Sequence, residues 1–178
     1  DHHEIPYKET EDGRELILPP ADAIVNPKQP DCNYPEKRLC GAVVALKLVT
    51  ALYEACGIPA KELEDFLELG AIATVGDVMD LQGENRILVK EGLKRLSHTS
   101  NKGLRELIRA NGLEDGLITA YHVGFVLGPC INASGRLDTA ARSLKLLCAK
   151  TEDEAAKLAG DLTALNQSRK ALTEEGKE

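Results

Sequence analysis

Apolar residues recur every three or four positions along most of the chain, which is the spacing of amphipathic helices. Residues 38–56 are apolar on most faces and predict a buried helix, in which Gly41 allows close packing. A further helix is predicted after Pro59, because proline is favoured in the first helical turn. The same spacing predicts helices within 86–96, 101–110, 117–127 and 139–148, and from residue 151 onward.

Two short stretches near the N-terminus have the pattern of β-strands. Residues 14–18 begin polar and become apolar, and they predict a strand. Residues 23–25 form an apolar run that predicts a short buried strand. Residues 74–78 are predicted to form a turn or a short strand at the end of the helix that follows Pro59. Together these elements predict an α/β fold in which helices outnumber strands.

The composition fits one domain of 178 residues, or one domain with a linker. The net charge of −7 argues against a generic nucleic-acid coat, which would be basic, but not against a nuclease, because metal sites are built of acids. The five cysteines show no C-x-x-C spacing and predict reduced, buried thiols. No signal peptide and no apolar run of transmembrane length is found, which predicts a cytoplasmic protein.

The tripeptide Asp1-His2-His3 and a carboxylate about 75 residues later, Asp77, are the ligand types that divalent metals take. Adjacent residues of an extended loop point to opposite sides, so one histidine can bind a metal while the other faces a substrate phosphate. Gly76 would let the backbone turn sharply beside Asp77. The alternatives are a disordered terminus and a solvated aspartate at a helix end.

A second group of residues suits a phosphate. Gly128-Pro129 is predicted to break the chain, and residues 132–136 follow as a small-residue turn that places backbone N–H groups beside a guanidinium. Arg86, Lys90 and Lys94 recur every four positions and would form a basic stripe on one helix face. The alternatives are a tight helix–helix turn with a surface arginine, and an ordinary solvated helix face.

The motifs, taken in their order along the chain, resemble those of the DHH phosphoesterase superfamily and, within it, those of the RecJ exonucleases. The resemblance starts at Asp1-His2-His3 and covers nearly the whole chain. Its other motifs are residues 21–27, 39–42, 73–78, 84–86, 124–125, 128–129, 131–137 and 165–169. The tripeptide alone is a weak signal, but the ordered set is strong, and the Asn-Ala-Ser-Gly-Arg element separates RecJ from members that act on small nucleotides.

The resemblance implies two-metal hydrolysis of phosphodiester bonds, with Mn²⁺ or Mg²⁺, and 5′-to-3′ digestion of single-stranded DNA in repair and recombination. Carried over residue by residue, His2 and Asp77 are metal ligands. His3 is implied to contact the scissile phosphate, and Asp1 to orient the site.

The resemblance also implies a set of residues that contact DNA phosphates. Arg136 is the main one, with Asn132 and Ser134 in the same element, and Arg86 is a further candidate. Ser134 stands where the family is expected to have alanine, which is a mild departure.

The family implies a domain organisation as well. Residues 1–150 would be the C-terminal portion of a DHH domain whose parallel sheet lacks its first strands, and residues 151–178 the start of a linker helix toward an absent DHHA1-type domain. The upstream acidic motifs of the family are absent, so this piece alone is expected to be inactive. An exposed sheet edge would favour self-association of the piece, whereas the parent is expected to be a monomer.

Two other functions stay open from the sequence. One is a DHH phosphodiesterase that acts on cyclic dinucleotides or very short oligonucleotides. The other is a catalytically dead DHH protein that binds DNA or a partner. The expected partners of an exonuclease are single-stranded DNA, a single-strand-binding protein and a helicase, with no membrane.

Overall fold

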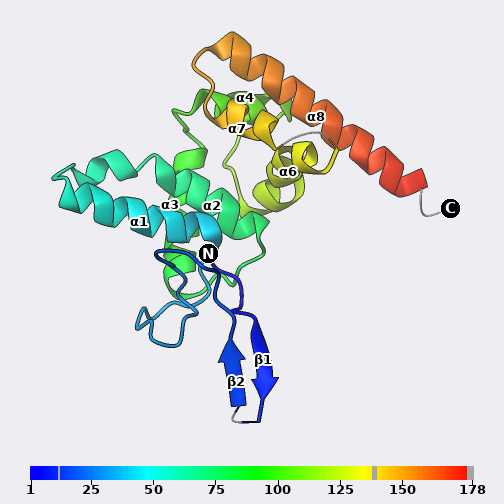
Figure 1. The fold of residues 1–178 in the computed structure, drawn as a ribbon. Helices are drawn as coiled ribbons and strands as arrows, with labels where there is room; N and C mark the ends of the chain where they lie inside the picture. Colours follow the sequence, from blue (N-terminus) through cyan, green and yellow to red (C-terminus); the bar gives the residue numbers. More distant parts are fainter. Residues whose placement is uncertain (12, 138–139, 176–178) are drawn as a thin grey trace.

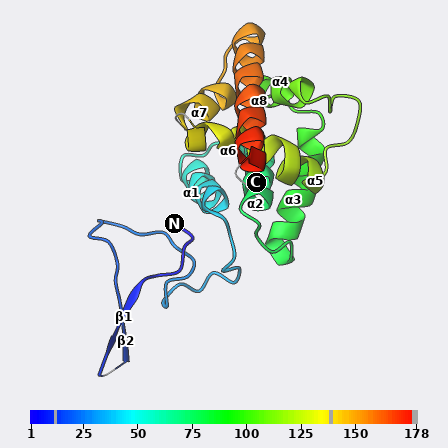
Figure 2. The same cartoon turned by 90° about the vertical axis from the view of Figure 1, so that its right-hand side faces the viewer.

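The computed structural model describes residues 1–11, 13–137 and 140–175, and within these ranges the side chains of all residues except Arg136, Leu137 and Glu175. A small β-hairpin projects from a body of packed helices, and the N-terminus lies between the hairpin and the start of α1 (Figures 1 and 2). The hairpin pairs β1 (Tyr7–Thr10) with β2 (Gly13–Leu16) in antiparallel fashion. The helical elements are α1 (Gly41–Ala55), η1 (Ala60–Leu63), α2 (Phe66–Gly76), α3 (Gly83–Leu96), α4 (Lys102–Ala110), α5 (Ala120–His122), η2 (Val123–Leu127), α6 (Gly128–Leu137), α7 (Ala141–Leu147) and α8 (Glu152–Glu175).

Helix α2 lies at the centre of the body because it contributes to both hydrophobic clusters. Its Ala71 packs with residues of α1 and α3, whereas its Ile72 packs with residues of α4, α6, α7 and α8. Helices α2 and α3 approach each other closely at Gly92, where a Cβ atom would stand 2.5 Å from the carbonyl oxygen of Leu67. Only glycine permits that approach, so Gly92 sets the spacing of the two helices that lead to and from Asp77.

Helix caps confirm two of the predicted boundaries. The side chain of Asn101 accepts a hydrogen bond from the Leu104 amide (3.0 Å) at the start of α4. The hydroxyl of Thr151 accepts one from the Glu154 amide (3.2 Å) at the start of α8. Such side chains satisfy N–H groups that have no partner inside the helix.

The helix-rich character is confirmed, but the predicted strands are only partly formed. Strand β2 begins at Gly13, one residue before the predicted strand 14–18. It ends at Leu16, two residues before the predicted end. Residues 23–25 are not a strand, and Val25 is 51% exposed. Among the described residues the strands are β1 and β2, which pair only with each other, so residues 23–25 have no partner strand. A parallel sheet therefore stays a prediction.

Helix α1 forms as predicted but is buried on one side only, since Leu48 and Leu52 are exposed. Helix α2 continues through Thr74, whose hydroxyl donates to the Gly70 carbonyl (2.7 Å), so the turn or strand predicted at 74–78 begins three residues later. The prediction of buried thiols holds for Cys40 and Cys130 but is wrong for Cys56 and Cys148, which are exposed.

The predicted break at Gly128-Pro129 and the predicted turn at 132–136 are both wrong, because these residues form α6. Proline is tolerated at the start of a helix, where its missing N–H would have no partner. Directly before it, η2 is a π-helical turn that runs without interruption into α6. A Cβ at Gly128 would stand 2.7 Å from the carbonyl oxygen of Val123, so this junction requires glycine.

Helix α8 is part of the body along its first half and leaves it toward its C-terminal end (Figure 1). Ala155, Ala159 and Leu162 are fully buried, and the helix packs against α4, α6 and α7. No helix among the described residues is long and apolar enough to cross a membrane.

Candidate metal-binding site

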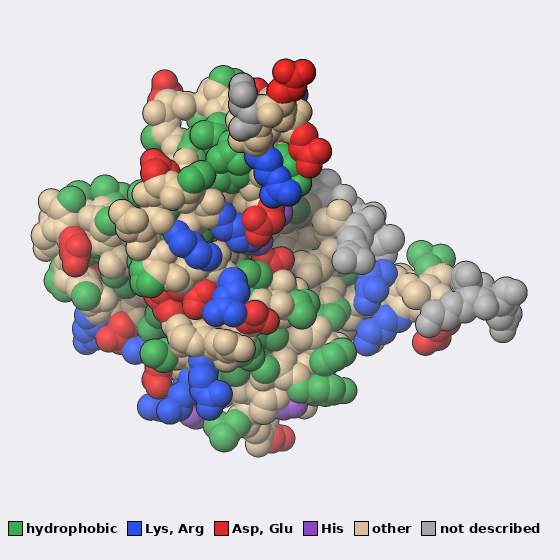
Figure 3. Space-filling view, turned by 90° about the horizontal axis from the view of Figure 1, so that it is seen from below, with side chains coloured by type: hydrophobic (Ala, Val, Ile, Leu, Met, Phe, Trp, Pro, Cys, Tyr) green, Lys and Arg blue, Asp and Glu red, His purple; other side chains and the backbone are tan. Residues whose placement is uncertain are grey.

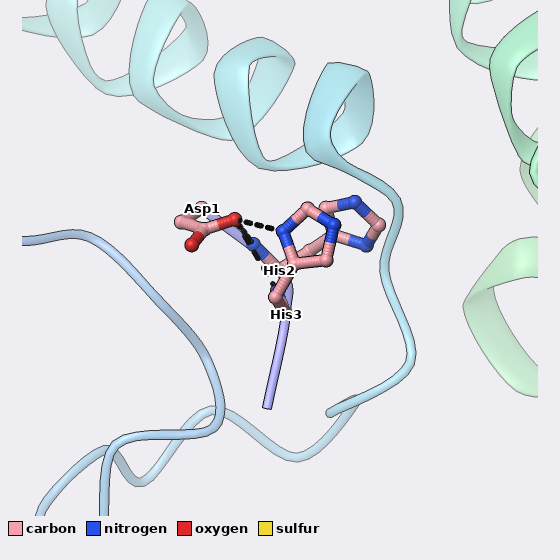
Figure 4. A group of neighbouring side chains, drawn as sticks. All are labelled: Asp1, His2 and His3. Atoms are coloured by element: carbon pink, nitrogen blue, oxygen red, sulfur yellow. Dashed lines mark hydrogen bonds and ion pairs between the residues drawn. The ribbon is translucent and has the colours of Figure 1, made fainter. Parts of the chain in front are cut away.

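The carboxylate of Asp1 folds the N-terminal tripeptide into a compact turn. Its Oδ1 atom accepts hydrogen bonds from the backbone amides of His2 (2.7 Å) and His3 (3.3 Å), and lies 2.7 Å from Nδ1 of His3. Figure 4 shows these three side chains beneath the first turn of α1. Because an ionised carboxylate only accepts, Nδ1 of His3 carries the proton and Nε2 is left free to face a ligand.

Two further contacts hold the tripeptide in place. The backbone nitrogen of Asp1 donates to the Val25 carbonyl (2.7 Å), and the Asn26 side chain donates to the His3 carbonyl (3.0 Å). The ring of His2 packs against the start of α1, where a Cβ at Gly41 would stand only 3.3 Å from its Cδ2 atom. The close approach predicted for Gly41 is therefore made to His2.

Asp77 caps the C-terminal end of α2. The Met79 amide bonds to the Thr74 carbonyl and the Val78 amide to the Val75 carbonyl, both at 3.1 Å, which is the Schellman arrangement. The left-handed residue is Val78, with φ of 56°, and not Gly76 as the sequence had indicated. A β-branched residue in this conformation is strained, so the backbone directly after Asp77 is held against its preference.

These two segments bring His2 and Asp77 together. Nε2 of His2 lies 3.5 Å from Oδ2 of Asp77, and the two side chains are 18% and 47% exposed. Two ligand atoms at about 2.1 Å from one ion, with an angle of about 90–115° between them, stand about 3.0–3.5 Å apart. The pair therefore fits a shared divalent cation such as Mn²⁺ or Mg²⁺.

The tripeptide itself offers a second set of ligand atoms. One atom each of Asp1, His2 and His3 lies within 4.8 Å of the other two. Asp1 already holds His3, so its position fits the orienting role implied by the family, and the largely exposed ring of His3 fits contact with a substrate. Carboxylate oxygens are suitable ligands for Mn²⁺ and Mg²⁺, whereas imidazole nitrogens are more typical of transition-metal sites.

A cavity of 390 Å³ lies between Asp77 and the surface of α6. Gly41 and Asp77 line it at the site, and Asn132 lines it on α6. A second cavity, of 140 Å³, shares Gly76, Gly128 and Asn132 with the first and is bordered by Arg169 of α8. We call the two cavities together the α6 cleft.

The structure describes three of the four predicted phosphate-binding side chains, and these three lie in different environments. Asn132 is exposed and lines the α6 cleft. Ser134 is fully buried, and its hydroxyl lies 2.7 Å from that of Ser143, so it cannot contact a phosphate in this structure. Arg86 is exposed on α3 but is not among the described residues that line the cleft, and the side chain of Arg136 lies outside the described part of the chain.

Sequence reasoning did not single out Arg169, although the motif at 165–169 contains it. A single basic residue on a polar helix has no periodic signal. Only the packing of α8 against α6 brings it beside Asn132.

The fold and the site define a helix-rich protein with a candidate divalent-metal centre beside a cleft. No family model matches the chain. The sequence is 41% identical, over 173 residues, to the single-stranded-DNA-specific exonuclease RecJ of Bacillus subtilis, and 38% identical over 165 residues to that of Escherichia coli. The chain is a homologue of part of RecJ.

Solved structures agree with this relationship. RecJ of Thermus thermophilus in complex with Mn²⁺ matches 82% of the chain with a TM-score of 0.72 and 41% identity. Another exonuclease RecJ, bound to manganese, matches 89% of the chain with a TM-score of 0.79 and 39% identity. The chain covers 20% and 29% of the two curated relatives, and 21% and 40% of the two solved chains.

Proposed function

We propose that this chain is the segment of a RecJ-type exonuclease that carries part of its metal site, and that the whole protein digests single-stranded DNA from the 5′ end. The observation that carries the proposal is the pairing of His2 with Asp77, at 3.5 Å between Nε2 and Oδ2, in a chain whose relatives are single-stranded-DNA-specific exonucleases. Residues 75 positions apart meet here with ligand atoms facing each other (77 − 2 = 75).

In this proposal His2 and Asp77 hold a Mn²⁺ or Mg²⁺ ion. When bound, such ions lower the pKa of water and stabilise charge on a phosphate that is being cleaved. His3, held by Asp1 through Nδ1, presents Nε2 to the scissile phosphate and stabilises its negative charge. One imidazole and one carboxylate are too few for two ions, so the segment alone has little or no activity.

The proposal also assigns a domain organisation and partners. Residues 1–150 belong to the catalytic domain, and α8 starts the connection to a further nucleic-acid-binding domain. A single-strand-binding protein and a helicase supply the DNA in a bacterial cytoplasm.

The test uses a protein extended to the full length of the relatives. It is incubated with Mn²⁺ and with single-stranded DNA labelled at the 5′ or the 3′ end, beside the variants Asp77→Ala and Asp80→Ala. Asp80 is the matched control because it lies on the same loop and is exposed, but it pairs with Arg38 (3.0 Å) instead of His2. We expect mononucleotides from the 5′ end, lost in Asp77→Ala and retained in Asp80→Ala.

The same assay separates the other functions. Hydrolysis of cyclic dinucleotides without cleavage of long DNA would replace the exonuclease with a small-substrate phosphodiesterase. DNA binding without any hydrolysis by an intact, folded protein would identify a catalytically dead homologue.

A further inference from the structure

Arg169 borders the smaller cavity of the α6 cleft, and neither His2 nor Asp77 is among the residues that line this cavity. This arginine is half-buried on α8, and Asn132, Gly124 and Pro129 line the cavity with it. Basic side chains lie on the part of α8 that projects from the body, as the space-filling view shows (Figure 3). The α6 cleft therefore has Asp77 in the lining of its larger cavity and a cation in the lining of its smaller one.

The guanidinium of Arg169 is oriented but not neutralised. Its Nε and Nη2 atoms donate to Oδ1 of Asn166, at 3.3 and 3.1 Å. Asn166 is itself buried, and its Nδ2 atom lies 3.5 Å from the sulfur of Cys130, which fixes the amide with its oxygen toward Arg169. Across the described ranges no carboxylate pairs with Arg169, whereas Arg95 pairs with Glu64 and Arg105 with Glu152.

An uncompensated, half-buried cation calls for an anion from outside the chain. Two hydrogen bonds to a neutral amide leave its positive charge intact, and a guanidinium has five N–H donors in a planar fork that matches phosphate oxygens. Asn132 lies beside it with a side-chain amide that can donate to a phosphate oxygen.

The smaller cavity suits an anion because Arg169 and Asn132 are its polar side chains, whereas apolar residues form most of the lining of the larger cavity. Gly76, Gly128 and Asn132 line both cavities, so the cavity that contains Asp77 adjoins the one that contains Arg169. A Cβ at Gly76 would meet no atom within 4 Å, so open space lies above the helix end at this point. Glycines leave room for a sugar-phosphate backbone to approach the helices.

We propose that Arg169 binds a backbone phosphate of single-stranded DNA in the smaller cavity of the α6 cleft, beside Asn132, for which the family resemblance already implies phosphate contact. Asn166 acts as a positioning residue that aims the guanidinium. The inference rests on the proposed function for the identity of the anion, but it concerns binding and not cleavage.

The test measures binding of a fluorescein-labelled oligothymidylate to the full-length protein by fluorescence anisotropy, in EDTA, at several salt concentrations. For Arg169→Gln we expect Kd to rise about tenfold. We also expect the slope of log K against log salt to fall by about 0.7, the value for one lost phosphate contact on a single strand. Arg169→Lys should retain the slope because the charge remains.

Arg105→Gln is the matched control, since Arg105 is also an arginine that contacts α8, but it does so outside the cleft and is paired with Glu152. It should leave Kd and slope unchanged. Thermal unfolding of each variant reports whether the fold is intact.

Four outcomes would overturn the inference. They are an unchanged Kd for Arg169→Gln, a raised Kd with an unchanged salt slope, an equal effect of Arg105→Gln, and a wild-type protein that binds no single-stranded DNA. If the protein binds DNA with an Arg169-dependent slope but cleaves none, the exonuclease proposal fails and the binding site at Arg169 stands.

Discussion

The two ends of helix α2 carry carboxyl groups in opposite situations. Glu68, in the first turn, is only 4% exposed, accepts a hydrogen bond from the Thr99 hydroxyl (2.8 Å), and has a pKa that burial raises above its usual value. Asp77, just past the last turn, is half-exposed and faces His2. One sequence element thus contains a structural carboxyl group and a candidate functional one.

The difference between them lies in their partners. The Thr99 hydroxyl that donates to Glu68 also accepts from the Asn101 amide (3.1 Å), so the contact ties α2 to the start of α4 and belongs to the fold. The negative charge of Asp77 lies at the C-terminal end of a helix dipole, where a carboxylate is disfavoured. A bound cation would offset that cost, so the position of Asp77 makes sense as part of a metal site.

The largest expected effect is a loss of metal binding, which should occur at the Asp77 end of α2 and not at the Glu68 end. Replacing His2 by Gln in the full-length protein should weaken Mn²⁺ binding by about 100-fold, because an imidazole ligand is lost, without lowering the unfolding temperature. The measurement is a Mn²⁺ titration followed by electron paramagnetic resonance. His98→Gln is the control, since His98 lines a cavity beside Glu68 at the other end of α2, and an equal loss there would remove the distinction.

The next effect concerns stability. Replacing Thr99 by Val keeps the shape but leaves the Glu68 carboxyl group buried without its donor, which should lower the free energy of unfolding by about 1–3 kcal/mol. Urea unfolding measures this change. Thr10→Val is the control, because the hydroxyl of Thr10 bonds only the exposed hairpin turn at the Gly13 carbonyl. Equal destabilisation by both variants would contradict a special role for the buried contact.

A smaller effect is the dependence of stability on pH. Because the pKa of Glu68 is raised in the folded state, the folded protein binds this proton more tightly than the unfolded chain. The stability it contributes is fully present below the ordinary carboxyl pKa of 4.5 and is lost as the pH rises through the raised value. Glu68→Gln should flatten this part of the pH profile of unfolding. An unchanged profile in Glu68→Gln would show that burial does not perturb this group.

The smallest effect lies beside Asp77. Val78→Gly should raise the free energy of unfolding by less than about 1 kcal/mol, since relief of the left-handed valine is partly offset by the greater flexibility of glycine in the unfolded chain. Differential scanning calorimetry would detect the shift. A destabilised variant would mean that the valine side chain, which is 88% exposed, contributes more than its strained backbone costs.

Local rules predicted much of the fold. The spacing of apolar residues placed α4 and α8, because amphipathic period acts within a few residues, and the structure shows that Asn101 and Thr151 cap their first turns. The errors arose where packing overrides local preference. Residues 132–136 have the composition of a turn but form α6, since Gly128 and Pro129 start a helix as readily as they end one.

The candidate site was only partly accessible from the sequence. The ligand types of His2 and Asp77 could be selected from their chemistry, and the structure brings them together. The burial of Ser134 against Ser143 and the arrival of Arg169 beside Asn132 depend on how α6 packs against α7 and α8, which no local pattern encodes.

The π-helical turn η2 determines which side chains of α6 face the cleft, because α6 continues directly from it. A π-turn amounts to one residue inserted into an α-helix, and each residue rotates a helix by about 100°. Deleting one residue between Val123 and Leu127 would therefore turn the face of α6, and Asn132 would leave the cleft although its own neighbours in sequence were intact. The position of Asn132 is a matter of helical phase, so the spacing between residues 123 and 132 should tolerate substitutions more readily than insertions or deletions.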